Sequence, residues 1–247
     1  ELCGMSLALA QEVGRSDLAG NLSVTLAKLA LRPGDLVRAQ SLLTAVLSHC
    51  EIPRDSYNCS LALLLLARAK ILQAEYDTAT SLVAQSQVID AEMGFEFLTS
   101  FAQMLLGEID LMNGDLAPAR AHYEQSIELL KVYFEPMTAV LSQRGLACVA
   151  LRQGDRATAE AAISASAQIS QTTNERWNRG LLEYTRGQLL WLDGDRTGLA
   201  HFQTGLEQLH KLGDLIGVAE GLERIAQGLG ADRQWERAAI LLGAADA

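Results

Sequence analysis

The residues that could form a metal or catalytic site are scattered along the chain. The four histidines are His49, His122, His201 and His210, and the closest two lie nine residues apart. Two metal ligands on one helix face need a spacing of three or four residues. The sequence also contains no GxSxG, HExxH or GxxxxGK[ST] motif. We therefore predict that the chain is not an enzyme and holds neither a metal nor a cofactor.

The cysteines are also too dispersed for a redox or metal motif. Cys3, Cys50, Cys59 and Cys148 are separated by 47, 9 and 89 residues, and none forms a CxxC pair. A helical chain of 247 residues does not need disulfides to stabilise its core. We expect buried thiols in a reducing, cytoplasmic environment.

The elements that position these residues follow from composition and an internal repeat. Leucine and alanine make up 79 of the 247 residues, and aromatic residues only 5%. So many helix formers predict an all-α protein. The dipeptide Gly-Asp recurs at multiples of 40 residues, beginning at Gly34, Gly114, Gly154 and Gly194. Glycine can end a helix in the left-handed conformation, and a following aspartate can cap the next helix.

Small side chains form two columns in the same register, twelve residues apart. The first column, seven residues before each turn, reads Ala27, Ala67, Gly107, Ala147, Gly187 and Gln227. The second column, five residues after each turn, reads Ala39, Ala79, Ala119, Ala159, Leu199 and Ala239. Small residues at both places let two antiparallel helices approach closely.

The repeat predicts one domain of six helical hairpins of about 40 residues, covering residues 1–247. The predicted repeats span 16–54, 55–94, 95–134, 135–173, 174–213 and 214–247. Pro136 suits a first helical turn, and Asn174 and Asp214 suit N-caps. The helix after Asp55 is apolar almost all round, which is typical of a core element or of an interface. Residues 2–13 read as the end of a leading helix, so we expect a fragment of a longer protein.

The two columns resemble the tetratricopeptide repeat, which places small residues twelve positions apart. The period exceeds the usual repeat of about 34 residues and resembles the superhelical region of large ATP-dependent LuxR-type regulators, such as the maltose-regulon activator. The segments GDLIGVAEGLE (213–223) and RAAILLGAA (237–245) are similar to the end of bacterial regulator repeat arrays. The resemblance implies a right-handed superhelix, or α-solenoid, in a parent protein with separate ATPase and effector domains.

In tetratricopeptide superhelices the first helix of each hairpin lines a concave groove. By this resemblance, the predicted binding residues are Arg68, Phe101, Met104, Arg144, Tyr184 and Trp191. Guanidinium groups and aromatic rings suit a peptide or an anionic ligand. The alternative is that these side chains fill the space between hairpins and pair with acidic neighbours.

Charge and hydropathy limit the possible partners. The net charge is −10, which disfavours direct binding to nucleic acid or to an anionic membrane. The longest apolar run, residues 61–67, is too short to span a bilayer. We predict a non-catalytic scaffold of a bacterial signalling or transcription regulator. It would bind a protein, a peptide or a small inducer in the groove and contact other domains of its parent. The alternative is a free-standing adaptor for multiprotein assembly.

Overall fold

The computed structural model describes residues 5–6, 9–10, 12, 15–31, 34–52, 55–173, 176–231 and 233–245, with only the backbone at positions 16, 17, 96 and 231. Every regular element in this described part is a helix, which confirms the predicted all-α class. Residues 5–6, 9–10 and 12 are helical, within the predicted leading helix. The predicted N-cap Asn174 lies outside the described residues.

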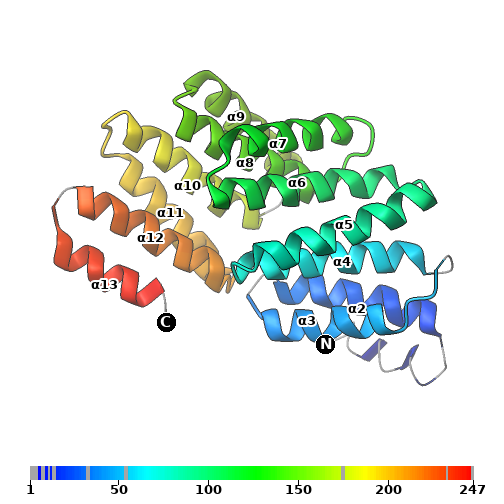
Figure 1. The fold of residues 1–247 in the computed structure, drawn as a ribbon. Coiled ribbons are helices and arrows are strands. Elements are labelled where there is room, and N and C mark those ends of the chain that lie inside the picture. The colour runs from blue at the N-terminus through cyan, green and yellow to red at the C-terminus, as the bar shows by residue number, and fades with distance from the viewer. Residues whose placement is uncertain are drawn as a thin grey trace. The chain divides into compact units, whose positions relative to one another are not determined.

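The described helices alternate between the first and second members of six hairpins (Figure 1). The first helices are α2 (Ser16–Leu31), α4 (Ser56–Leu72), α6 (Glu96–Asn113), α8 (Pro136–Gln153), α10 (Arg176–Leu192) and α12 (Leu215–Ala231). The second helices are α3 (Leu36–Ser48), α5 (Tyr76–Met93), α7 (Leu116–Leu130), α9 (Arg156–Thr172), α11 (Gly198–Lys211) and α13 (Trp235–Ala245). Each first helix packs against the second helix that follows it. The pairing of helices into hairpins agrees with the repeat read from the sequence.

The chain divides into two compact units, Glu1–Tyr133 and Phe134–Ala247, which we call unit 1 and unit 2. Unit 1 contains α2 to α7 and unit 2 contains α8 to α13. Their boundary falls at the predicted junction of the third and fourth repeats. The grouping of all six hairpins into one domain, and the right-handed path of the superhelix, stay predictions.

Within each unit the first helices form a continuous layer. In unit 1, α4 packs against both α2 and α6, and in unit 2, α10 packs against both α8 and α12. The second helices of successive hairpins do not contact one another in the described part of either unit. A stack whose first helices touch while its second helices are spread apart bends toward the first helices. We call this inner layer the first-helix wall of each unit.

The apolar helix α4 is a core element of unit 1. It contacts α2, α3, α5 and α6, so neighbours surround it. Its five consecutive apolar residues 61–65 are all buried, and so is Ala67. Of the two interpretations of its all-round hydrophobicity, core filling therefore holds.

The glycine turns end helices as predicted. Gly114 and Gly154 have φ angles of 88° and 73°, and each donates its amide to a carbonyl in the last turn of the preceding helix. Ala74 occupies the corresponding place in the second hairpin at a φ of 58°, a conformation that glycine adopts at lower cost. The residue that ends each of these helices contacts only the last helical turn, so the helix end can be predicted from the local sequence.

The aspartates that follow these turns do not all cap. Asp35 accepts a hydrogen bond from the Arg38 amide at 3.1 Å, and Asp155 accepts one from the Thr158 amide at 3.2 Å. Asp115, in contrast, makes no side-chain cap hydrogen bond to α7. The sequence-based expectation of a cap at every turn is therefore wrong at Asp115.

This difference gives a paired stability prediction. Replacing Asp155 with alanine should lower the free energy of unfolding by about 1 kcal/mol, because it removes a cap of α9. Replacing Asp115 with alanine should change it by less than about 0.5 kcal/mol. Urea titrations followed by circular dichroism measure both. Equal losses in the two variants would contradict this assignment of the caps.

The small-residue columns mark close helix contacts in the first four hairpins but shift after residue 187. Ala27, Ala67, Ala119 and Ala159 are fully buried, as predicted. In the fifth hairpin the close contact to Gly187 comes from Gly198, not from Leu199, because α11 begins only at Gly198.

The sixth hairpin is shifted in the same direction. Ala226 and Ala238 are buried there in place of the predicted Gln227 and Ala239. Both predicted columns are therefore one residue out of register in this hairpin, although the spacing of twelve is kept. The Gly-Asp signal that fixes the register is missing at residues 234–235.

Two cysteines form a disulfide, which corrects the prediction of free thiols. Cys50 follows α3 and Cys59 lies in the second turn of α4, and their Cα atoms are 6.0 Å apart. This separation is within the usual range for a disulfide. The two cysteines are nine positions apart in the sequence, so they meet although they form no CxxC motif. Cys148 is a free thiol.

Candidate binding surface

The predicted binding residues of unit 1 all lie on the first-helix wall but differ in exposure. Arg68 on α4 and Phe101 on α6 are partly buried. Met104, one turn further along α6, is 1% exposed and packs in the core. At this position the side chain fills space between helices, which is the alternative raised by the sequence.

Two of the three predicted residues of unit 2, Arg144 and Tyr184, make polar contacts to α12. Arg144 on α8 and Trp191 on α10 are partly buried, whereas Tyr184 on α10 is 1% exposed. The Tyr184 hydroxyl donates a hydrogen bond to the Gly217 carbonyl at 2.8 Å. The ring of Trp191 packs over Gly228, where an added Cβ would lie 3.1 Å from the indole. Whether any of the six predicted residues contacts a ligand stays a prediction.

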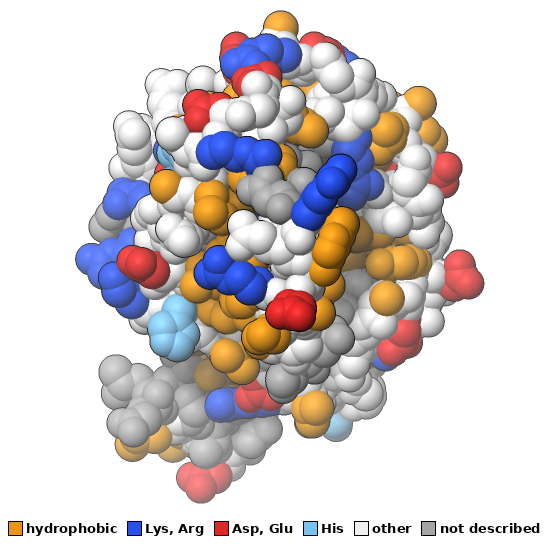
Figure 2. Space-filling model, turned by 90° about the vertical axis from the view of Figure 1, so that its left-hand side faces the viewer, with side chains coloured by type: hydrophobic (Ala, Val, Ile, Leu, Met, Phe, Trp, Pro, Cys, Tyr) orange, Lys and Arg blue, Asp and Glu red, His pale blue; other side chains and the backbone are white. Residues whose placement is uncertain are grey.

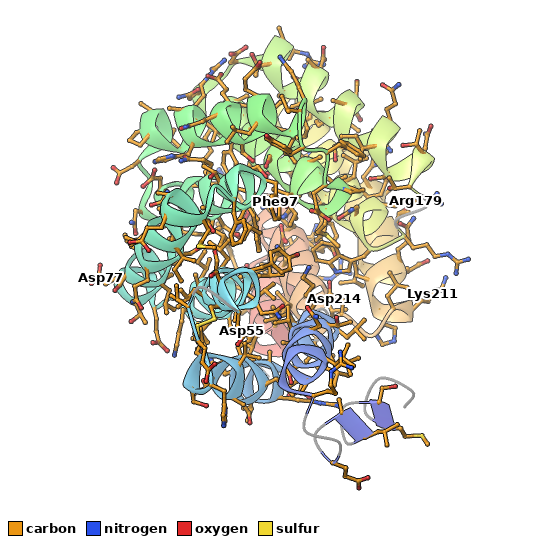
Figure 3. All side chains as sticks on the ribbon, turned by 90° about the vertical axis from the view of Figure 1, so that its right-hand side faces the viewer. Asp55, Asp77, Phe97, Arg179, Lys211 and Asp214 are labelled. Atoms are coloured by element: carbon orange, nitrogen blue, oxygen red, sulfur yellow. A yellow bond between two sulfur atoms is a disulfide. The ribbon has the colours of Figure 1, made fainter. Side chains whose placement is uncertain are left out.

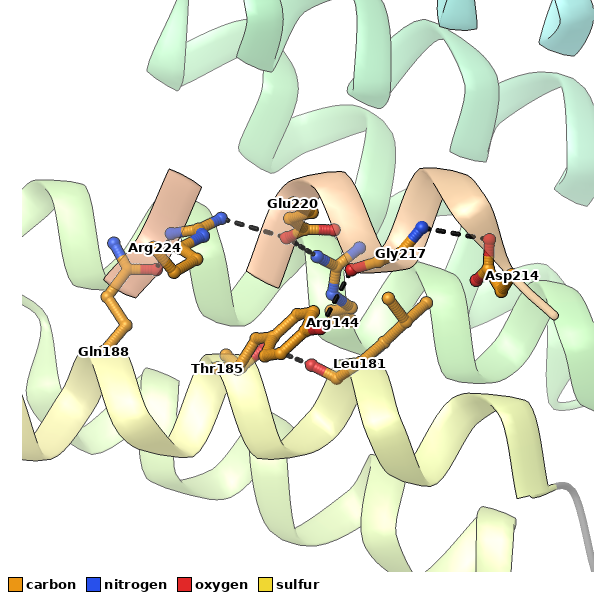
Figure 4. Close-up of polar contacts among 9 residues, drawn as sticks. Arg144, Leu181, Thr185, Gln188, Asp214, Gly217, Glu220 and Arg224 are labelled. Carbon is orange, nitrogen blue, oxygen red and sulfur yellow. Dashed lines mark hydrogen bonds and ion pairs between the residues drawn. The ribbon is translucent and has the colours of Figure 1, made fainter. Parts of the chain in front are cut away.

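Two ion pairs and a hydrogen bond join all three first helices of unit 2 (Figure 4). The Glu220 carboxylate on α12 accepts hydrogen bonds from Arg144 on α8 and, at 3.2 Å, from Arg224 on α12. Arg224 also donates to Gln188 Oε1 on α10 at 2.6 Å. The three charged side chains are 19–24% exposed, so they are only partly hydrated. One carboxylate between two guanidinium groups leaves this part of the wall net positive.

The two arginines keep Glu220 ionised. Burial of this carboxylate would raise its pKa, but Arg144 and Arg224 outweigh burial and lower the pKa below the ordinary value of 4.5. A folded-state pKa below the unfolded-state pKa means that the ion pairs stabilise the fold above about pH 4.5. That stabilisation is lost as the pH falls through the lowered value.

We therefore expect Glu220→Gln to lower the free energy of unfolding by about 1.5 kcal/mol at neutral pH. The difference from the wild type should shrink in acid, because the wild-type carboxyl then also becomes neutral. Urea titrations at neutral and acidic pH measure it. The control is Glu223→Gln, an exposed position on the same helix, which should have little effect. If Glu220→Gln lowers the free energy of unfolding by the same amount at both pH values, the ion-pair account is contradicted.

A second set of contacts fixes the start of α12 against α10. Asp214 is 2% exposed and accepts a hydrogen bond from the Gly217 amide at 2.9 Å, which confirms the predicted N-cap. Its other oxygen accepts a hydrogen bond from the Trp177 indole.

Burial, together with the charges of Glu220 and Asp214, raises the pKa of Tyr184 well above its ordinary value. Tyr184 therefore stays neutral and acts as an interhelical anchor.

Unit 1 carries an aromatic cluster at the starts of α4 and α6. Tyr57 at the start of α4 lies 5.7 Å from Phe97 on α6, measured between ring centres. Phe95, just before α6, lies 6.0 Å from Phe97 and 6.1 Å from Tyr57. Tyr57 and Phe97 are 41% and 40% exposed. Exposed aromatic rings of this kind are enriched at protein interfaces.

A mixed surface of basic and hydrophobic side chains lies at the hairpin turns of unit 2. Trp235 and Leu192 are 65% and 60% exposed. The Arg196 guanidinium lies 4.5 Å from the centre of the Trp191 ring, in cation–π geometry. Figure 2 shows lysine and arginine side chains interspersed with hydrophobic ones on the visible face. Tryptophan and arginine are the residues that most often dominate binding energy at interfaces.

Two of the histidines contact polar side chains of the preceding helix. His122 contacts Gln103 and Asp110, and His201 contacts Glu183. Among the described residues, no group of three or more His, Cys, Asp or Glu side chains is placed to hold a metal ion. No described helix is both long and apolar enough to cross a membrane. The expected absence of enzymatic activity and of a cofactor stays a prediction.

Sequence reasoning missed Glu220, the centre of the network in unit 2. Its i,i+4 spacing from Arg224 on α12 is a local signal that could have drawn attention to it. Its contact with Arg144 joins residues 76 positions apart, so it depends on how two hairpins stack.

The stacked hairpins and their inner wall define a helical-repeat protein of the tetratricopeptide class. The chain belongs to the tetratricopeptide repeat-like domain family, whose model matches residues 5–141. Among solved structures it is similar to the apo form of RapI, with a TM-score of 0.72 and 12% sequence identity over 90% of this chain and 80% of that chain. At this identity the likeness shows the fold alone. A search of curated proteins gives no significant match.

Proposed function

We propose that this chain is a non-catalytic interaction domain that binds a protein or peptide partner, or a small inducer, on its first-helix wall. The observation that carries the proposal is the row of residues one position after the small residue in each first helix. In unit 1 this row reads Lys28, Arg68 and Glu108, and all three side chains are at least partly exposed. The flanking wall positions, such as Leu64 and Met104, are buried.

Such a row suits stepwise recognition of an extended partner. Equivalent positions on successive hairpins carry different side chains, so each hairpin can contact a different part of the ligand. In unit 2 the equivalent positions on α8 and α10 are Cys148 and Gln188, both partly exposed. There the pair Arg144 and Arg224 provides positive charge for an acidic or carboxylate group.

We further propose that the domain serves a bacterial signalling or transcription regulator in the cytoplasm. The similarity of residues 213–245 to regulator repeat arrays supports this context. The net charge of −10 favours protein partners over direct contact with nucleic acid or anionic membranes. Disulfides persist mainly in oxidising compartments, so the cytoplasmic assignment requires that Cys50 and Cys59 be reduced in the cell.

Paired alanine variants test whether the wall is required for binding. The wall variants are Lys28→Ala and Gln188→Ala, and the controls on a second helix are Lys211→Ala and Gln203→Ala, which match them in residue type. Tagged proteins are purified from the native cell, and co-purifying proteins are quantified by mass spectrometry. We expect a partner that is lost with at least one wall variant and kept with both controls. A set of partners that is equal in all four variants would contradict the proposal.

A further inference from the structure

Unit 1 contains a cavity of about 310 Å³ between α2, α3 and the start of α4. This volume lies at the lower end of the range found for small-molecule sites. Small residues create the space, namely Ala10, Ala19, Gly20 and Ala45, and Val46 and Cys59 also line it. The cavity therefore has a largely apolar wall.

Two hydrogen-bond acceptors at the start of α4 line the same cavity. Asn58 Oδ1 is buried and has no hydrogen-bond partner in the structure. Asp55 occupies the N-cap position of α4, yet its carboxylate makes no cap hydrogen bond. A buried acceptor without a partner costs about 1–3 kcal/mol, which a ligand with a donor would recover. The two residues are three positions apart, so they lie on the same side of the first turn.

His49 also lines the cavity and can supply a third acceptor there. Its Nδ1 lies 3.0 Å from the Ala45 carbonyl oxygen, which can only accept a hydrogen bond, and 3.0 Å from the Ser48 hydroxyl, which donates its own proton to the same carbonyl. We therefore assign the proton of the neutral ring to Nδ1, which leaves Nε2 as an acceptor. His49 lines the cavity together with Asp55 and Asn58.

The charge of the lining selects the ligand class. Among the ten described residues that line the cavity, Asp55 is the one that is formally charged when His49 is neutral. Its carboxylate repels anions and attracts cations. An alkylammonium group offers one positive charge and three N–H donors, which matches the three acceptors.

We propose that this cavity binds an alkylammonium group, with the ammonium at Asp55, Asn58 and His49 and the aliphatic chain against the alanine wall. The group can belong to a free aliphatic amine or to the lysine side chain of a peptide. The disulfide between Cys50 and Cys59 ties the end of α3 to α4 and so holds His49 near the other two acceptors. This site is separate from the polar row of the first-helix wall, so its failure would leave the proposed function intact.

Titrations of the whole chain with four probes test the ligand class. The probes are pentylammonium, neutral pentanol, anionic pentanoate and the peptide acetyl-Gly-Lys-Gly-amide, followed by the amide NMR signals of Gly20, Ser23 and Asn58. We expect saturable shifts with pentylammonium, binding of pentanol weaker by about tenfold or more, and no saturable shift with pentanoate. Tighter binding of the peptide than of pentylammonium assigns the site to lysine side chains, and weaker binding assigns it to free amines.

Three variants test the residues. Asp55→Asn should weaken binding of pentylammonium about tenfold, whereas Asp77→Asn should leave it unchanged. Figure 3 shows Asp77 on the outer side of unit 1, away from Asp55. Asn58→Asp keeps an acceptor and adds a negative charge, so it should tighten binding, a gain that unfolding cannot produce.

The proposal is overturned if neither pentylammonium nor the peptide gives a saturable shift. It is equally overturned if Asp55→Asn binds pentylammonium as tightly as the wild type does, or if Asn58→Asp fails to tighten binding.

Discussion

Replacing Gly198 with alanine is expected to lower the free energy of unfolding by about 3 kcal/mol. An added Cβ at this position would lie 2.5 Å from the Gly187 carbonyl oxygen and 3.1 Å from the Trp191 amide nitrogen. Both atoms belong to the backbone of α10, so they can move only if α10 and α11 separate. The loss in the free energy of unfolding therefore measures how closely α10 and α11 approach each other in the fifth hairpin.

The control for Gly198 is another helical glycine. Gly243 lies in α13, and an added Cβ there would meet nothing within 4 Å. Because alanine favours a helix over glycine, Gly243→Ala should be neutral or stabilising by up to about 1 kcal/mol. Urea unfolding of both variants measures the contrast. A similar effect of the two substitutions would show that α10 and α11 do not approach as closely as the structure indicates.

Removing the disulfide is expected to lower the free energy of unfolding by about 2.5 kcal/mol. The bond closes a short loop between residues nine positions apart and restricts the unfolded chain. Thermal unfolding of the wild type should therefore shift to lower temperature when a reductant is added. The double variant Cys50→Ser/Cys59→Ser should unfold at the lower temperature under both conditions.

Alkylation, together with the unfolding experiment, decides between the disulfide and the free thiols predicted from the sequence. Wild-type protein purified without reductant should show no reaction of Cys50 or Cys59 with an alkylating reagent, as mapped by peptide mass spectrometry. Reaction of both cysteines, or an unfolding temperature insensitive to reductant, would restore the prediction of free thiols. It would also favour the cytoplasmic assignment.

The features predicted correctly from the sequence are those that act over a few residues. The bounds of α8 follow from Pro136 in its first turn and from Gly154, which ends it in the left-handed conformation. The N-cap at Asp214 is likewise local. Such signals depend on the backbone within three or four positions, so they can be read without knowing the fold.

The features missed depend on register or on distant contacts. In the fifth hairpin the small residue at the helix contact is Gly198, one position before the predicted Leu199, because α11 begins only at Gly198. The partner of Arg144 is Glu220, two hairpins away. The burial of Tyr184 depends on Gly221, where an added Cβ would lie 2.7 Å from the ring carbon that carries the hydroxyl. These contacts follow from the stacking of helices, which periodicity alone does not fix.

The most direct test of the wall as a binding surface is photo-crosslinking in the native cell. A photoreactive phenylalanine analogue is placed at Gln188 on first helix α10 and, as the control, at Gln203 on second helix α11. The account predicts that one partner is crosslinked from Gln188 and not from Gln203. If a partner is instead crosslinked from Gln203 and none from Gln188, the account is contradicted and binding is assigned to the second helices.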